Sequence, residues 1–164
     1  MSYDFNADEI FQIAEQIERN GATFYRKMSE SVSDEQMKKE LLNLESMEKE
    51  HEKTFSSLRA NLSAQERKQT VFDPEGEAAL YLQALSDIRV FDKQAEKDFV
   101  IPSGSSEEEI IRKIFREAIN LEKESIVFYI GMKELVPEAL GKKRIDEIIK
   151  EEMGHIRLLS TKLF

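Results

Sequence analysis

Two short stretches of this sequence share one spacing of glutamate and histidine: residues 45–51 read ESMEKEH, and residues 150–155 read KEEMGH. In each stretch a glutamate stands three positions before a histidine, Glu48 before His51 and Glu152 before His155. Residues i and i+3 lie on the same face of an α-helix, so the two side chains of each pair point the same way. The chain has 2 histidines in all, and both belong to such a pair.

The two stretches are part of a longer internal repeat. A shift of 104 positions, without any gap, matches Glu48 to Glu152 and His51 to His155. The other matched residues include Phe11 with Phe115, Ala14 with Ala118, Glu18 with Glu122, Phe24-Tyr25 with Phe128-Tyr129, Met28 with Met132, and Val32 with Val136. A repeat of this regularity predicts two similar structural units related by pseudo-twofold symmetry, with equivalent positions facing each other in the core.

Capping signals and breakers divide the chain into four long helices and a shorter one. The expected helices run from Asn6, whose partner in the capping box is Glu9, to about Ser31; from Ser33, with Gln36 as its partner, to about Leu62; over about 74–92, after Asp73-Pro74; from Ser105-Ser106 to about Val136; and from Pro137 to the C-terminus. We therefore expect one all-α domain over residues 1–164, in which hairpins 6–62 and 105–164 are joined by a long helical crossover, 63–104.

Each long helix has a stripe of residues at spacings of 3 and 4 that is apolar at both ends and polar in the middle. The four stripes are Phe11, Ala14, Glu18, Gly21, Tyr25, Met28, Val32; Leu41, Leu44, Glu48, His51, Phe55, Leu58; Phe115, Ala118, Glu122, Ser125, Tyr129, Met132, Val136; and Ile145, Ile148, Glu152, His155, Leu159. Four glutamates and two histidines are thereby expected at one level of the interior.

Burying four carboxylates needs a compensating charge, because each isolated carboxylate costs several kcal/mol or more to remove from water. Two dications would neutralise them, and the histidines would complete the coordination. The alternatives are a solvated helix face, which is common for a lone Glu-x-x-His, and a purely structural polar network. Placement of both pairs on the core stripe favours metal ligands. Three other acids of the first stretch fall off the stripe and are predicted to be surface charge: Glu45, Glu50 and Glu52.

Residues beside the predicted ligands have two interpretations each. Tyr25 and Tyr129 are either packing residues or donors of a hydrogen bond to a carboxylate ligand from the opposite hairpin. Gly21 and Ser125 either allow close packing or leave space for oxygen or peroxide. Donors of this kind, without sulfur, favour iron or manganese.

Composition limits the other function classes. The net charge of −9 argues against nucleic acid or an anionic membrane as a partner. No apolar run approaches the roughly 20 residues of a membrane span, and the start MSYDFNADEI lacks the features of a signal peptide. The chain has no cysteine, so a cytoplasmic location is expected.

The paired Glu-x-x-His motifs, the Glu-x7-Tyr spacings from Glu18 to Tyr25 and from Glu122 to Tyr129, and the repeated hairpin resemble the ferritin-like superfamily. Within it the chain is most similar to stand-alone rubrerythrin-type proteins. The resemblance implies a ferritin-like bundle with two iron ions per chain, peroxidase or ferroxidase activity, and a homodimer or higher oligomer. It also implies that Glu48 and Glu152 bridge the metals, that Glu18 and Glu122 are terminal ligands, and that His51 and His155 supply nitrogen.

The sequence departs from rubrerythrins and ferritins at three points. It has no cysteines for a rubredoxin iron, so an external electron donor protein is implied. Ser125 stands where rubrerythrins have an additional glutamate, and no further helix is expected after His155, which argues against a ferritin cage. Two functions follow: an oxidoreductase that reduces hydrogen peroxide or oxygen as iron(II) is oxidised, or a non-catalytic iron-binding or delivery protein. Manganese in place of iron, with catalase-like dismutation, is a third interpretation.

Overall fold

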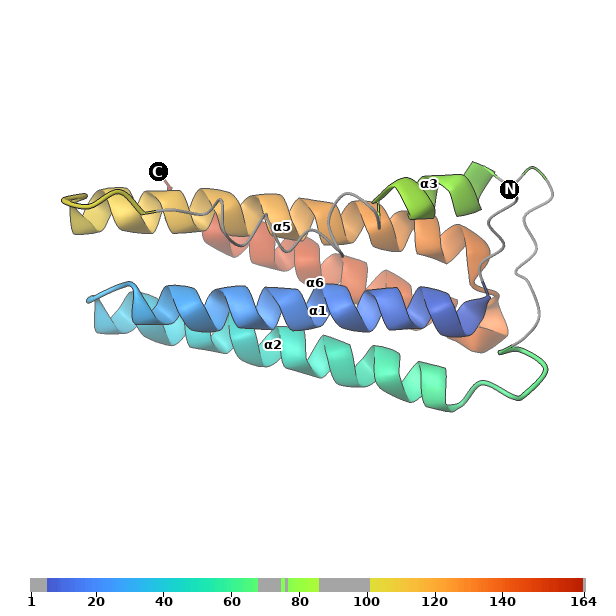
Figure 1. The fold of residues 1–164 in the computed structure, drawn as a ribbon. Helices are drawn as coiled ribbons and strands as arrows, with labels where there is room; N and C mark the ends of the chain where they lie inside the picture. The colour runs from blue at the N-terminus through green and yellow to red at the C-terminus, as the bar shows by residue number, and fades with distance from the viewer. Residues whose placement is uncertain (1–5, 68–74, 76, 86–100, 164) are drawn as a thin grey trace.

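Four long helices lie side by side along one axis in the computed structural model (Figure 1). The structure describes residues 6–67, 75, 77–85 and 101–163. Its elements are α1 (Ala7–Glu30), α2 (Glu35–Ala60), α3 (Glu77–Leu85), α5 (Glu107–Leu135), the 3-10 helix η2 (Glu138–Leu140) and α6 (Lys142–Ser160). Among these residues there is no strand, so the expected all-α class is confirmed.

The long helices form two antiparallel hairpins, α1 with α2 and α5 with α6, and α1 also packs against α5. α2 and α5 run in the same direction, so the start of α5 lies at the opposite end of the bundle from the end of α2 (Figure 1). Within this connection α3 packs against α5, where the Tyr81 hydroxyl donates to the carbonyl of Val127 at 3.2 Å. The predicted helix over 74–92 is described only as Glu77–Leu85; its Asp73-Pro74 start and its predicted part after Leu85 lie outside the described residues.

The starts of α1 and α5 agree with the capping signals, whereas the start of α2 does not. The Asn6–Glu9 capping box opens α1, and Ser106 with Glu109 forms the same reciprocal bonds at α5. The prediction that Ser33 caps α2 is wrong, because the cap is Asp34, whose side chain accepts from the backbone N–H of Met37 at 2.8 Å. Ser33 instead donates its backbone N–H to Glu107 at 2.6 Å, which links the α1–α2 turn to the start of α5.

The prediction that the last long helix begins at Pro137 is wrong. Pro137 precedes the single turn of η2, and α6 starts after Gly141. Gly141 has φ +106°, in the left-handed region that favours glycine, and a Cβ there would lie 2.8 Å from a Leu58 methyl group. The left-handed residue separates η2 from α6, and the close approach of Leu58 ties this corner to α2.

The hydrophobic core consists of two clusters on either side of the middle of the bundle. One cluster joins the first half of α1 to the end of α2, the second half of α5 and the start of α6, and includes Phe11, Phe55, Tyr129, Met132, Ile145 and Ile148. The other occupies the opposite end and includes Tyr25, Met28, Leu41, Leu44, Phe115 and Leu159. The predicted stripes, apolar at both ends, therefore do face the core.

Replacing Gly141 tests the corner that η2 and α6 share. Gly141→Ala should lower the free energy of unfolding by about 1–3 kcal/mol, because a non-glycine residue in the left-handed region is strained and its methyl would collide with Leu58. Gly154→Ala in α6, where a Cβ meets nothing within 4 Å, should instead stabilise by up to about 1 kcal/mol. Urea denaturation of the two variants measures both effects, and equal stabilities would contradict the assignment.

Candidate metal centre

The polar middles of the four stripes meet between the two apolar clusters. Glu18, Glu48, Glu122 and Glu152 lie near the middle of α1, α2, α5 and α6, respectively, and all four are buried. Glu18 and Glu152 have no exposed surface, and His51 retains 1%. The structure thus brings together all six residues that the sequence singled out, His155 included.

Two overlapping groups of side chains in this cluster have the geometry to hold a cation each. The first group is Glu18, Glu48, His51 and Glu152, and the second is Glu48, Glu122, Glu152 and His155. In each group, one potential ligand atom per residue lies within 4.8 Å of every other. Glu48 and Glu152 belong to both groups, so two cations bound here would share these two carboxylates.

The distances within the cluster divide it in the same way. The Nδ1 atom of His51 lies 2.9 Å from Glu152 Oε1 and 3.3 Å from Glu18. The Nδ1 atom of His155 lies 2.8 Å from Glu152 Oε2, 3.4 Å from Glu122 and 3.6 Å from Glu48. The two oxygens of Glu152 therefore face different histidines, and the imidazole rings stack with their centroids 5.8 Å apart.

Buried polar atoms in this cluster lack hydrogen-bond partners among the described residues. These atoms are Glu18 Oε2, Glu48 Oε1, His51 Nδ1, both oxygens of Glu152, and both ring nitrogens of His155. Buried polar groups without partners are rare in proteins, because each costs about 1–3 kcal/mol or more when charged. All of these atoms belong to residues of the two groups described above, as expected of residues that bind cations.

When no cation is bound, the cluster perturbs the pKa of every group in it. Burial raises the pKa of Glu122 to about 8, and burial together with repulsion from the other carboxylates raises that of Glu48 well above its ordinary value. Burial opposes the charged form of the histidines, but contacts with the carboxylates outweigh it and raise the pKa of His51 to about 11 and that of His155 to about 9. Protons thus take the place of cations in neutralising the carboxylates.

The two tyrosines bind the cluster from the opposite hairpins. Tyr25 of α1 donates its hydroxyl to Glu122 of α5, and Tyr129 of α5 donates to Glu18 of α1. These are the hydrogen bonds expected under the second interpretation of the tyrosines, so their role is more than packing. Each bond fixes one carboxylate and joins the two hairpins at the level of the cluster.

Gly21 provides room for a carboxylate. A Cβ on Gly21 would lie 2.5 Å from Glu48 Oε2, so the glutamate occupies the space that a side chain at position 21 would take. This close approach favours the first interpretation of Gly21, close packing. Ser125, its counterpart in the repeat, is buried and donates its hydroxyl to the carbonyl of Glu122 at 2.8 Å.

Two acidic residues of this region differ from what the sequence indicated. Glu45 was predicted to be surface charge, but it is buried, and it pairs with Lys49 at 2.5 Å and with Arg26 of α1 at 3.6 Å. Glu151 was not singled out at all, yet its carboxylate lies 2.8 Å from His51 Nε2. This contact is between helices and 100 positions apart, so no local spacing signals it. Glu50 is exposed and Glu52 is partly exposed, as expected.

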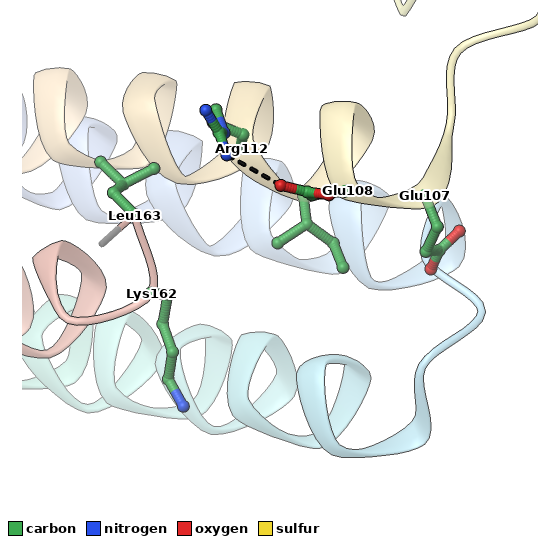
Figure 2. Close-up of a pocket in the computed structure, with 6 residues that line it drawn as sticks. Glu107, Glu108, Arg112, Lys162 and Leu163 are labelled. Atoms are coloured by element: carbon green, nitrogen blue, oxygen red, sulfur yellow. Dashed lines mark hydrogen bonds and ion pairs between the residues drawn. The ribbon is translucent and has the colours of Figure 1, made fainter.

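A separate pocket of about 410 Å³ lies between the start of α5 and the residues after α6, and none of the six clustered residues lines it (Figure 2). Its lining combines Glu107, Glu108, Arg112 and Lys162 with the apolar Ile111 and Leu163. The charged groups are already paired: Arg112 donates to Glu108 at 2.8 Å, and Lys162 donates to Glu40 at 3.0 Å. No buried polar atom without a partner faces it among the described residues, and we assign it no ligand.

The fold has a counterpart among solved structures: a protein from Thermotoga maritima provisionally described as a ferritin-like diiron-carboxylate protein. The match covers 99% of this chain and 97% of that chain, with a TM-score of 0.71 and 23% sequence identity. No protein-family model and no curated protein matches the sequence. The likeness confirms the predicted ferritin-like four-helix bundle, while the narrower resemblance to rubrerythrins stays a prediction. None of the helices in the described part of the chain combines the length and apolar character that crossing a bilayer requires.

Gly21→Ala should separate stability from metal binding. Alanine in a helix interior is favoured over glycine by up to about 1 kcal/mol, so the protein without metal should be no less stable. The added methyl would push away the carboxylate of Glu48, and manganese(II) affinity, measured by anaerobic calorimetry, should fall at least about tenfold. Gly154→Ala, with open space around its Cβ, is the matched control and should bind as the wild type does. Unchanged affinity in Gly21→Ala would contradict a ligand role for Glu48.

Metal binding should release protons. The pKa values of His51 and His155 are raised to about 11 and about 9, so both imidazoles are protonated at pH 7. A cation must displace these protons to bind. Affinity should therefore rise as the pH increases from 6 to 9. Calorimetric titration with manganese(II) in buffers of different ionisation enthalpy counts the protons, and we expect about two or more per chain at saturation. A heat of binding that does not depend on the buffer would show that no protons are released, which would contradict this prediction.

Proposed function

We propose that this chain binds two iron ions between its four helices and uses them to reduce hydrogen peroxide or oxygen. The observation that carries the proposal is the pair of buried ligand groups that share Glu48 and Glu152. Four carboxylates balance the charge of two dications, and each group adds one imidazole nitrogen. A purely structural network would leave far fewer of these buried atoms without partners.

Under this proposal the six residues take three roles. Glu48 and Glu152 would be shared by the two metals, which is supported by the opposite orientation of the two Glu152 oxygens toward His51 and His155. Glu18 and Glu122 each bind one metal, and each is oriented by a tyrosine from the opposite hairpin. The histidines bind through Nδ1, the atom that faces the carboxylates in both.

The donor set supports iron or manganese as the metal. It consists of carboxylate oxygens and imidazole nitrogens, and the chain offers no thiolate, which argues against sites for soft metals. The description of the structurally similar Thermotoga maritima protein as a diiron-carboxylate protein supports iron in particular.

Two iron(II) ions would supply the two electrons that reduce one hydrogen peroxide to two waters, with two protons, or one oxygen to hydrogen peroxide. The chain's own residues prepare the site for this chemistry. Burial, with the nearby charges of Glu122 and Glu18, keeps the pKa of the hydroxyls of Tyr25 and Tyr129 well above the ordinary value, so both remain hydrogen-bond donors. The apolar clusters above and below the ligands exclude bulk water from the bundle.

A second candidate function is iron binding or delivery without turnover. It is favoured by the composition, since these 164 residues contain no cysteine and so hold no rubredoxin-type iron that could pass electrons to the cluster. The oxidoreductase therefore requires an electron donor outside these 164 residues, such as a separate donor protein, whereas delivery requires only uptake and release. A homodimer or higher oligomer is compatible with both functions and stays a prediction.

Anaerobic loading with iron(II), followed by stopped-flow mixing with peroxide and with oxygen separately, distinguishes the two functions. Wild-type protein should bind two irons per chain and oxidise them faster than free iron(II) reacts. Glu48→Ala and His51→Ala should lose at least one iron, while the exposed Glu50→Ala should keep both. Iron binding with oxidation no faster than in solution would favour delivery, and failure to bind iron or manganese would refute both.

A further inference from the structure

The two halves of the proposed metal centre differ in the hydrogen-bond partner of the histidine Nε2 atom, which is the ring nitrogen that does not face the carboxylates. On its outer side, His51 Nε2 lies 2.8 Å from the carboxylate of Glu151. His155 Nε2 is buried and has no hydrogen-bond partner within the described residues. The repeat explains the difference: the counterpart of Glu151, 104 positions earlier, is Met47, whose thioether cannot replace a carboxylate as an acceptor.

This difference affects the atoms that face the cations. A neutral imidazole carries its proton on one ring nitrogen and a lone pair on the other. The carboxylate of Glu151 accepts the proton of Nε2, so the lone pair of His51 is held on Nδ1, which faces Glu18 and Glu152. Nothing among the described residues selects the same tautomer or ring orientation for His155.

Glu151 also contacts a residue of its own helix. Its side chain is 39% exposed. Arg144, about two turns earlier on α6, lies 3.4 Å from its other oxygen and also binds Glu147 at 2.8 Å. The carboxylate is thus anchored between a surface arginine and a buried imidazole, and it connects the cluster to the surface of α6.

We infer that the two metal positions are inequivalent, and that Glu151, as a positioning residue, makes the position of Glu18, Glu48, His51 and Glu152 the tighter one. The inference rests on the proposed metal-binding role of these residues. Carboxylates that hold a histidine ligand from behind typically contribute 10–100-fold in metal affinity. The position of His155, which lacks such a partner, fills second.

Anaerobic calorimetry with manganese(II) tests this inference. Wild-type protein should show two steps that differ by about 10–100-fold in affinity. Glu151→Ala should weaken the first step by a similar factor and bring the two steps together. Glu147→Ala is the matched control, because it removes another carboxylate bound to Arg144 on the same helix, and it should leave both steps unchanged. Met47→Glu, which restores the missing counterpart, should strengthen the second step.

A spectroscopic measurement separates positioning from a general structural effect. In zinc-loaded protein, long-range proton–nitrogen NMR spectra should show a hydrogen-bonded Nε2 proton on His51. This signal should be lost in Glu151→Ala, while the signals of His155 stay in place.

The outcomes distinguish this inference from the proposed function. Two unequal steps that persist in Glu151→Ala would overturn the inference, since repulsion between the cations alone would then account for them. Two equal steps in the wild type would also overturn it and leave the metal-binding role intact. Absence of any binding of manganese(II), zinc(II) or iron(II) would refute the proposed function itself.

Discussion

The charge of four carboxylates in the middle of a helical bundle is the constraint on which the rest of this structure depends. Removing an ion from water costs several kcal/mol even after the protein relaxes, so the carboxylates require positive charge close by. The chain supplies two histidines at that level, and without cations the carboxylates raise the pKa of both imidazoles, which stabilises their protonated form. Two imidazolium charges cannot neutralise four carboxylates, and burial together with repulsion from other carboxylates raises the pKa values of Glu48 and Glu122. The site is therefore built for a larger positive charge than its own residues carry.

Packing around the carboxylates follows from the same constraint. Apolar clusters at both ends of the bundle provide the stability that the polar middle does not. Tyr25 and Tyr129 each donate a hydrogen bond to one carboxylate of the opposite hairpin. Gly21, although glycine is unfavourable within a helix, leaves the space that the carboxylate of Glu48 occupies. Buried polar atoms and a helical glycine are each locally unfavourable, but together they fix the arrangement of the clustered carboxylates.

The repeat makes the two halves of the centre alike, and the departures from it are informative. Glu45, buried beside Lys49 and Arg26, corresponds to the buried Ile149 in the second hairpin. Glu151, behind His51, corresponds to Met47. The six clustered glutamates and histidines keep the symmetry, whereas the residues just outside them do not. Two metals bound in the proposed positions would therefore have different surroundings.

The sequence by itself determined the helical class, the two hairpins and the level at which six ionisable residues meet. Helical periodicity and an ungapped repeat are both visible directly in the order of the residues. Capping chemistry also located the starts of α1 and α5 at Asn6 and Ser106. Only the tertiary structure decided which atoms touch across helices. The burial of Glu45, the contact between Glu151 and His51, the role of Gly21 beside Glu48 and the left-handed corner at Gly141 all depend on distances between segments far apart in the chain. Such distances are set by how the helices pack together, and no spacing within one helix encodes them.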